Sequence, residues 1–230
     1  MLRTAIYVFA ALTLVAASAL AAEITDVNNT FRFTVPEGWT QEPPPMPALT
    51  VVVVSPRRPE TGGNCNVVAG QDEATKSMSQ SEVEAQAAAQ INEEFWKGGI
   101  SAVRGVKSTT IEKWGDKTQR GRKVFYMKAT TDFAIGDVAF IVTQVIDLHP
   151  LPGRTYVVTC TARAEGFARE ESDFESIMAS FEPTPEMTVA AVRDRTPVTS
   201  VIGRSQAMAR NAATLAADSV NAGAARAGVR

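Results

Sequence analysis

Few residues of this sequence have the types and spacing that chemistry requires. His149, in the stretch "DLHPLPG", is the one histidine, and Cys65 and Cys160 are the two cysteines. A Ser-His-Asp or Cys-His mechanism would need His149 as its base. Because Pro150 and Pro152 follow it, we expect His149 to be an exposed residue of a turn. A hydrolase that uses His149 is the less favoured alternative.

Other signatures of catalysis or cofactor binding are absent from the sequence. It contains neither the G-x-S-x-G of hydrolases, nor G-x-G-x-x-G, nor a phosphate-binding G-x-x-x-x-G-K-[ST] motif. One histidine and two distant cysteines are too few for a zinc site. We therefore predict no metal site, no cofactor and no enzymatic activity.

The first residues predict export. Arg3 precedes an apolar run that ends in Ala19-Leu20-Ala21, an A-x-A cleavage site, so residues 1–21 are typical of a signal peptide. A membrane anchor is the alternative. We expect a periplasmic or secreted bacterial protein that is not an integral membrane protein after cleavage.

Export favours a disulfide bond between the two cysteines. An even pair of cysteines in an oxidising compartment usually forms a bridge. Cys65 and Cys160 lie in "NCNVVAGQDE" and "RTYVVTCTAR", which both resemble strands. Two buried free thiols are the alternative, because spacing alone does not establish proximity.

The charges of the chain bear on its partners. Acidic residues outnumber basic ones overall, 25 to 23, which argues against a nucleic-acid-binding protein. The stretch from Met187 onward is instead basic, and suits contact with an anionic surface. We predict that the partner is an envelope protein or such a surface. The candidate contact residues are Arg57, Arg58, Trp96, Arg204 and Arg210.

Strand patterns dominate the body of the chain. The apolar run 48–56 is typical of a strand that is buried on both faces. Short polar connections between the later strands predict antiparallel hairpins. The other expected strands are 30–35, a strand around Cys65, 108–114, 121–131, 135–147 and 154–162.

Two amphipathic helices are expected. In the first, residues 79–97, apolar residues recur every four positions, and Gly98-Gly99 should end the helix. Phe95 belongs to this apolar stripe, so we expect Trp96 to point away from the core and to be exposed. The second helix lies within 167–181, where Phe174, Ile177 and Met178 share one face.

The composition changes after residue 183. The stretch 182–200 contains three prolines and no clear periodicity, which is typical of a linker. The remainder is rich in alanine and arginine, with Val201, Met208 and Leu215 seven residues apart. We expect 184–230 to be disordered or loosely helical.

Two stretches carry a resemblance to a known family. "FRFTVPEGW" at the start of the body and "FESIMASFEP" at its end, with the element order between them, resemble the PsbP/Mog1-like superfamily and its secreted bacterial members of the DcrB type. The resemblance spans about residues 30–183. It implies an α+β domain (residues 22–183), with an antiparallel sheet of about six or seven strands and helices on its faces.

The first of these stretches also has a physical interpretation. Pro36 lacks an N–H and should end the strand before it. Trp39 can then fold back over the sheet and bury its large ring.

The function expected from the sequence is correspondingly broad. The resemblance implies a non-enzymatic binding or assembly factor of the cell envelope, and a fold alone does not specify chemistry. The alternative is a carrier of a small apolar ligand, with its pocket between the long helix and the sheet.

Overall fold

A computed structural model describes residues 21–45, 47 and 49–184. Residues 1–20 and 185–230 lie outside the described residues, and with them most of the expected signal peptide and all of the C-terminal extension that bears Arg204 and Arg210. Within the described residues, no helix is both long and apolar enough to span a membrane.

The body is built on a seven-stranded sheet in which every pair of neighbours is antiparallel. This confirms the predicted α+β class. In spatial order the strands are β3 (Thr40–Glu42), β4 (Val51–Val54), β5 (Asn64–Gln71), β9 (Arg154–Arg163), β8 (Val138–Leu151), β7 (Arg122–Ile135) and β6 (Val106–Gln119). A smaller sheet joins β1 (Ala22–Thr25), β2 (Phe31–Val35) and β10 (Glu182–Pro183).

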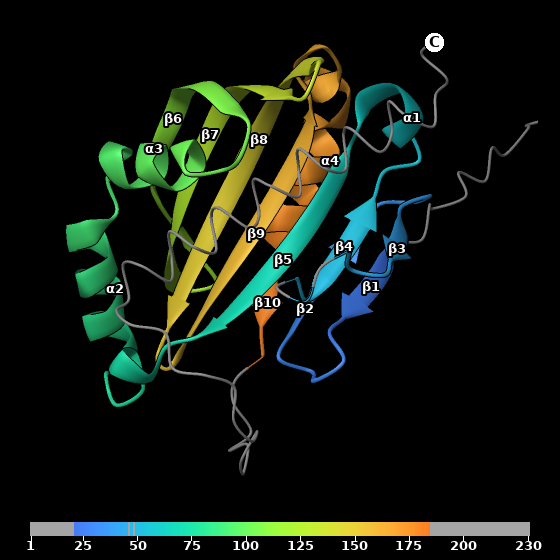
Figure 1. Ribbon diagram of the computed structural model, residues 1–230. Helices are drawn as coiled ribbons and strands as arrows, with labels where there is room; N and C mark the ends of the chain where they lie inside the picture. The colour runs from blue at the N-terminus through green and yellow to red at the C-terminus, as the bar shows by residue number, and fades with distance from the viewer. Residues whose placement is uncertain (1–20, 46, 48, 185–230) are drawn as a thin grey trace, which may run out of the picture.

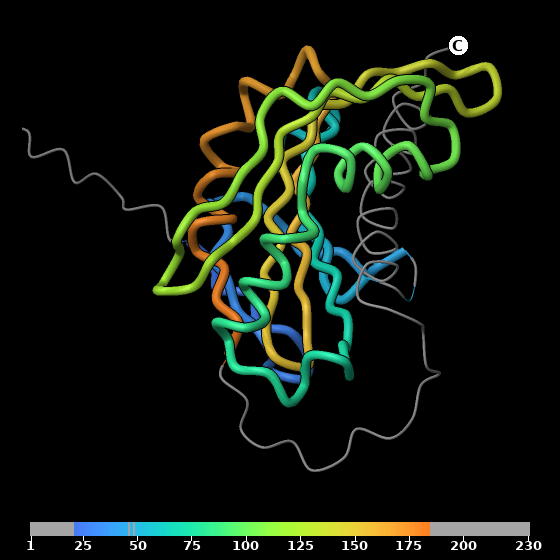
Figure 2. The backbone as a smooth tube through the Cα atoms, turned by 90° about the vertical axis from the view of Figure 1, so that its left-hand side faces the viewer, coloured from blue at the N-terminus to red at the C-terminus, as the bar shows by residue number. Residues whose placement is uncertain are grey.

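Helices cover both faces of the large sheet, as Figures 1 and 2 show. Helix α4 (Phe167–Ser180) and the small sheet lie on one face, and α2 (Gln80–Gln90) and α3 (Glu93–Ser101) lie on the other. The short α1 (Arg58–Thr61) and the 3-10 turns η1 (Glu73–Thr75) and η2 (Ala164–Gly166) connect these elements. All four valines of β4 are buried, alternately in the two apolar clusters, so this strand is buried on both faces as predicted.

The "PEGW" turn couples β2 to α4. Strand β2 ends at Val35, because Pro36 has no N–H to donate to a ladder. The ring of Trp39 then packs edge-on against Phe174, with 6.0 Å between the ring centroids. Its indole Nε1 donates a hydrogen bond to Asp173 Oδ2 at 3.1 Å. The turn therefore fixes the N-terminal strand on the helix that ends the domain.

The predicted helix 79–97 is two helices. A capping box of Ser79 and Glu82 starts α2, but Ile91 is extended, with φ −85° and ψ 108°. The Oδ1 of Asn92 then accepts a hydrogen bond from the N–H of Phe95 at 2.8 Å and starts α3. An asparagine side chain competes with helical hydrogen bonds in this way. The expected stop at Gly98-Gly99 is wrong, because α3 continues to Ser101.

The later strands are longer than the sequence predicts. The hairpin between β6 and β7 turns within Arg120 and Gly121, whose φ values of 51° and 74° are those that a tight two-residue turn needs. Residues 114–119, expected in a connection, therefore belong to β6. Similarly, β8 runs on to Leu151, which places His149 in a strand and not in a turn.

Candidate functional site at His149

The predicted disulfide bond is present. Cys65 of β5 and Cys160 of β9 are direct neighbours across the two strands, with their Cα atoms 4.0 Å apart. Both residues are buried in the apolar cluster beneath α4. The bond therefore joins two central strands and is part of the core.

Arg57 and Arg58, predicted as contacts for a partner, make ion pairs within the protein. Arg57 Nη2 donates to Glu170 Oε2 at 2.9 Å and also pairs with Asp173. The hydrogen bond to buried Glu170 is the main cause of the raised pKa of Arg57. Arg58 pairs with Glu42 at 2.8 Å. These bonds give both arginines a structural role that needs no partner.

The prediction that Trp96 is exposed is wrong. The indole is fully buried and packs edge-on against Phe95, with 5.2 Å between the centroids. Because α3 begins afresh at Glu93, the stripe of the expected long helix does not continue through it. Phe95, Trp96 and Ile100 all face the core instead.

The prediction that His149 is exposed is also wrong, since only 5% of the residue is accessible. It lies on the α4 side of β8, where its ring packs against Phe181 at a centroid distance of 4.7 Å. Pro150 does not end β8, because its register partner Thr155 continues the hairpin and its carbonyl accepts a hydrogen bond from Gln80. His149 is thus held between the sheet and the end of α4.

A pocket opens beside His149, where the β6–β7 hairpin meets the C-terminal end of α4. Gln119 fixes this contact, because its Nε2 donates to the carbonyls of Met178 at 2.9 Å and Phe181 at 3.1 Å. The cavity has a volume of about 100 Å³. That is room for several waters, at roughly 10–15 Å³ each. The lining residues are Gln119, Arg120, Arg122, His149, Phe181, Glu182 and Pro183.

The two arginines of the lining differ in their partners. Arg120 Nη1 pairs with Glu182 Oε2 at 2.7 Å, and Arg32 pairs with the same oxygen at 3.0 Å. The hydrogen bond from Arg32 is the largest cause of the lowered pKa of Glu182. Arg122 makes no ion pair or side-chain hydrogen bond with any residue in the described part of the chain. The lining therefore contains a cation that a ligand could neutralise.

The imidazole of His149 is neutral near pH 7. Burial, and then the charges of Lys117 and Arg122, lower its pKa from 6.5 to about 3. Its Nε2 is buried and has no hydrogen-bond partner among residues 21–184 that the structure describes. Lys117 itself is bound to Asp147 Oδ2 at 2.6 Å, and burial raises the pKa of that carboxyl. A buried nitrogen without a partner is uncommon in proteins and indicates a missing water or ligand.

This arrangement suits the binding of an anion. A neutral imidazole can donate from Nε2, and a guanidinium presents several N–H donors to a carboxylate or phosphate. No nucleophile among the described residues is hydrogen-bonded to His149 Nε2. Nor do any three described histidine, cysteine or acidic residues cluster as metal ligands would.

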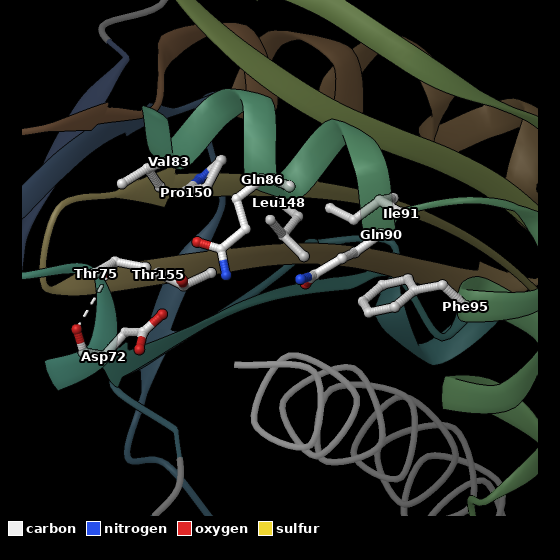
Figure 3. Close-up of a pocket in the computed structure, with 11 residues that line it drawn as sticks. Asp72, Thr75, Val83, Gln86, Gln90, Ile91, Phe95, Leu148, Pro150 and Thr155 are labelled. Carbon is white, nitrogen blue, oxygen red and sulfur yellow. Dashed lines mark hydrogen bonds between the residues drawn. The ribbon is translucent and has the colours of Figure 1, made fainter. Parts of the chain in front are cut away.

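A second pocket lies between α2 and the sheet, where an apolar-ligand carrier would need one. Figure 3 shows Gln86, Gln90 and Phe95 around it, together with Leu148 of β8. By the same measure it holds only about 20 Å³, the space of about one water. An apolar ligand could therefore enter only if α2 moved.

Comparison with known proteins places the fold. Neither protein-family models nor curated proteins match the chain. Among solved structures, it is similar to cyanobacterial PsbP (CyanoP) from Synechocystis sp. PCC 6803, with a TM-score of 0.50 and 14% identity over 74% of this chain and 95% of that one. The fold is PsbP-like. At this identity the likeness establishes the PsbP-like architecture and no chemistry.

Two further structures are more distant. LpqN, involved in cell envelope biogenesis of Mycobacterium tuberculosis, has a TM-score of 0.43 and 13% identity, over 73% of this chain and 92% of its own. A protein of Bacteroides thetaiotaomicron VPI-5482 has a TM-score of 0.43 and 12% identity, over 71% and 48% respectively.

Sequence reasoning misses most of the His149 pocket. The signal that could have found it is "KTQRGRK", residues 117–123, where four cations fall within seven residues. By local pattern alone this stretch reads as a polar connection. Side chains alternate between the two faces along a strand, so Lys117, Gln119 and Arg122 lie on the same face of the sheet as His149 of β8.

Proposed function

We propose that this protein is an exported, non-catalytic binding module of the cell envelope that takes an anionic group of its partner in the His149 pocket. The observation that carries the proposal is the buried Nε2 of His149 beside the guanidinium of Arg122, neither of which has a hydrogen-bond partner within the described residues. The anionic group is a carboxylate or a phosphate, since both match these donors.

Export is supported by two features of the chain. The N-terminal residues have the pattern of a signal peptide. The Cys65–Cys160 bond is of the kind that persists in oxidising compartments. A periplasmic location and membership among the DcrB-type proteins belong to the same proposal.

The test uses the sole histidine of the mature, untagged chain (residues 22–230). The ring signals of His149 can be followed by NMR without further assignment, while inorganic phosphate or acetate is added in parallel titrations at constant ionic strength. Saturable shifts of the ring signals are expected. The anion that binds at lower concentration identifies the chemical class.

A matched pair of variants locates the binding. Arg122→Gln should abolish the response of His149, because it removes the unpaired cation of the pocket. Lys123→Gln removes the same charge from the next residue, which pairs with Asp116 on the other side of the strand, and should leave the response intact. The proposal would be overturned if neither anion shifted the ring signals of His149. It would also be overturned if the anions shifted these signals equally in the Arg122→Gln and Lys123→Gln variants.

A further inference from the structure

The face of the large sheet that bears α2 and α3 carries buried polar residues on β5, β9 and β8, beside the valines of β4. The register aligns Val52 with Asn66 and Asn66 with Thr159, and one row further Thr161 with Gln144. These residues are all buried. We call this surface the polar half-face: Val52, Val54, Asn66, Gln144, Thr159 and Thr161.

The polar groups of the half-face lack partners within the described residues. Both amide atoms of Asn66 and of Gln144, and the hydroxyls of Thr159 and Thr161, make no hydrogen bond to any residue that the structure describes. Buried side-chain amides and hydroxyls are nearly always hydrogen-bonded. Six such atoms on one surface therefore indicate a covering element that supplies donors and acceptors.

The described helices on this side lie over the other half of the sheet. The principal contact of α2 is with β8 and that of α3 is with β6. Helix α4 packs on β8 and β9 from the opposite face. The half-face thus has buried valines and unpartnered polar groups, with no described helix centred on it.

We propose that the C-terminal segment 201–219 docks on the polar half-face as a helix. In such a helix Val201, Ser205, Met208, Ala212, Leu215 and Ser219 form one stripe. Its apolar members match Val52 and Val54, and its serines both donate and accept hydrogen bonds. The inference does not depend on the His149 pocket.

The length of the chain permits this docking. The described residues end at Thr184, beside β10. The residues from there to 200 span up to roughly 50 Å when extended. Stacked layers lie about 10 Å apart, so the linker can pass around the edge of the sheet.

The experiment uses the full mature chain. The double variant Met208→Asp/Leu215→Asp places charges within the stripe, and Ala213→Asp/Ala217→Asp places the same charges on the opposite side of the helix. NMR follows the side-chain amide signals of Asn66 and the methyl signals of Val52 and Val54. The side-chain amide of Gln86, a residue of α2 that lines the pocket between this helix and the sheet, reports whether the fold is intact.

The stripe variant should shift the signals of Asn66, Val52 and Val54 while that of Gln86 stays in place, and the control variant should shift none of them. If the Asn66 signals have the same positions in the wild type, the stripe variant and the control variant, the proposal is overturned. Signals that depend on protein concentration, with a dimer in sedimentation, would assign the half-face to a second copy and overturn it equally.

Discussion

At the scale of single residues, His149 is the least expected feature. A lone histidine beside prolines is buried because β8 continues through it and Phe181 packs on its ring. Burial, with the charges of Lys117 and Arg122, keeps its imidazole neutral. Burial of an ionisable group that has no partner costs free energy. His149 lies at a pocket, and ionisable groups with strongly shifted pKa values are concentrated at functional sites.

The lowered pKa makes stability depend on pH. An unfolded chain binds a proton on His149 below about pH 6.5, whereas the folded protein does so only near pH 3. The free energy of unfolding should therefore fall as the pH drops from about 6.5 towards 3, by at most about 1.4 kcal/mol per pH unit. In His149→Gln this contribution should be absent, as urea denaturation at a series of pH values would measure.

Asp147 provides the internal control for this experiment. Its raised pKa acts in the opposite sense, because its contribution to stability is lost as the pH rises above its ordinary value of 3.8. Both proteins retain Asp147, so the difference between their slopes reports His149 alone. Equal slopes would contradict the assigned state of His149.

At the scale of elements, the break between α2 and α3 determines what the second helix buries. Asn92 restarts the helix, and both Phe95 and Trp96 then enter the core. In a single continuous helix with Phe95 in its apolar stripe, Trp96 would lie about 100° away from Phe95 around the helix axis.

Removal of this cap should weaken the whole domain. Asn92→Ala is expected to lower the free energy of unfolding by about 1 kcal/mol, because the N–H of Phe95 loses its acceptor. Asn92→Asp keeps a side-chain oxygen at the same position and should cost almost nothing, since aspartate caps a helix as well as asparagine does. Urea denaturation of the two variants measures the difference, and equal stabilities would show that the cap is unimportant.

What the sequence predicts, and what it does not, follows from the range of the interactions. The strand before Pro36, the burial of Trp39 and the stripe of α4 depend on local pattern, and all were predicted. The burial of Trp96 depends on one asparagine that competes with the helix. The burial of His149 depends on pairing with a strand that follows it and on Phe181, 32 residues later in sequence. Neither the burial of Trp96 nor that of His149 can be predicted from the local pattern of apolar residues.

At the scale of the whole molecule, the disulfide bond closes a loop between residues 95 positions apart. Such a bond restricts the unfolded chain, and for a loop of this length the stabilisation is about 4–5 kcal/mol. Wild-type protein with and without a thiol reductant should differ by this amount in guanidinium denaturation. The two samples differ only in the bond itself.

Thiol labelling completes the test. Denatured protein that has not been reduced should contain no reactive thiol, since neither cysteine is free in the structure. Two labelled thiols would contradict the presence of the bond. A guanidinium midpoint that is the same with and without the reductant would contradict the predicted stabilisation.

The pairings of β5 with β9 and of β2 with β10 also set an order of events during synthesis. Strand β5 is complete at residue 71, but its neighbour β9 is made only with residues 154–163. Strand β2 is complete at residue 35, but its neighbour β10 is made only with residues 182–183. Each of these two early strands therefore emerges from the ribosome long before one of its two partner strands. Contacts this distant in sequence form slowly, because the intervening chain must first be ordered. The domain consequently reaches its native state only after almost all of its described residues have been made.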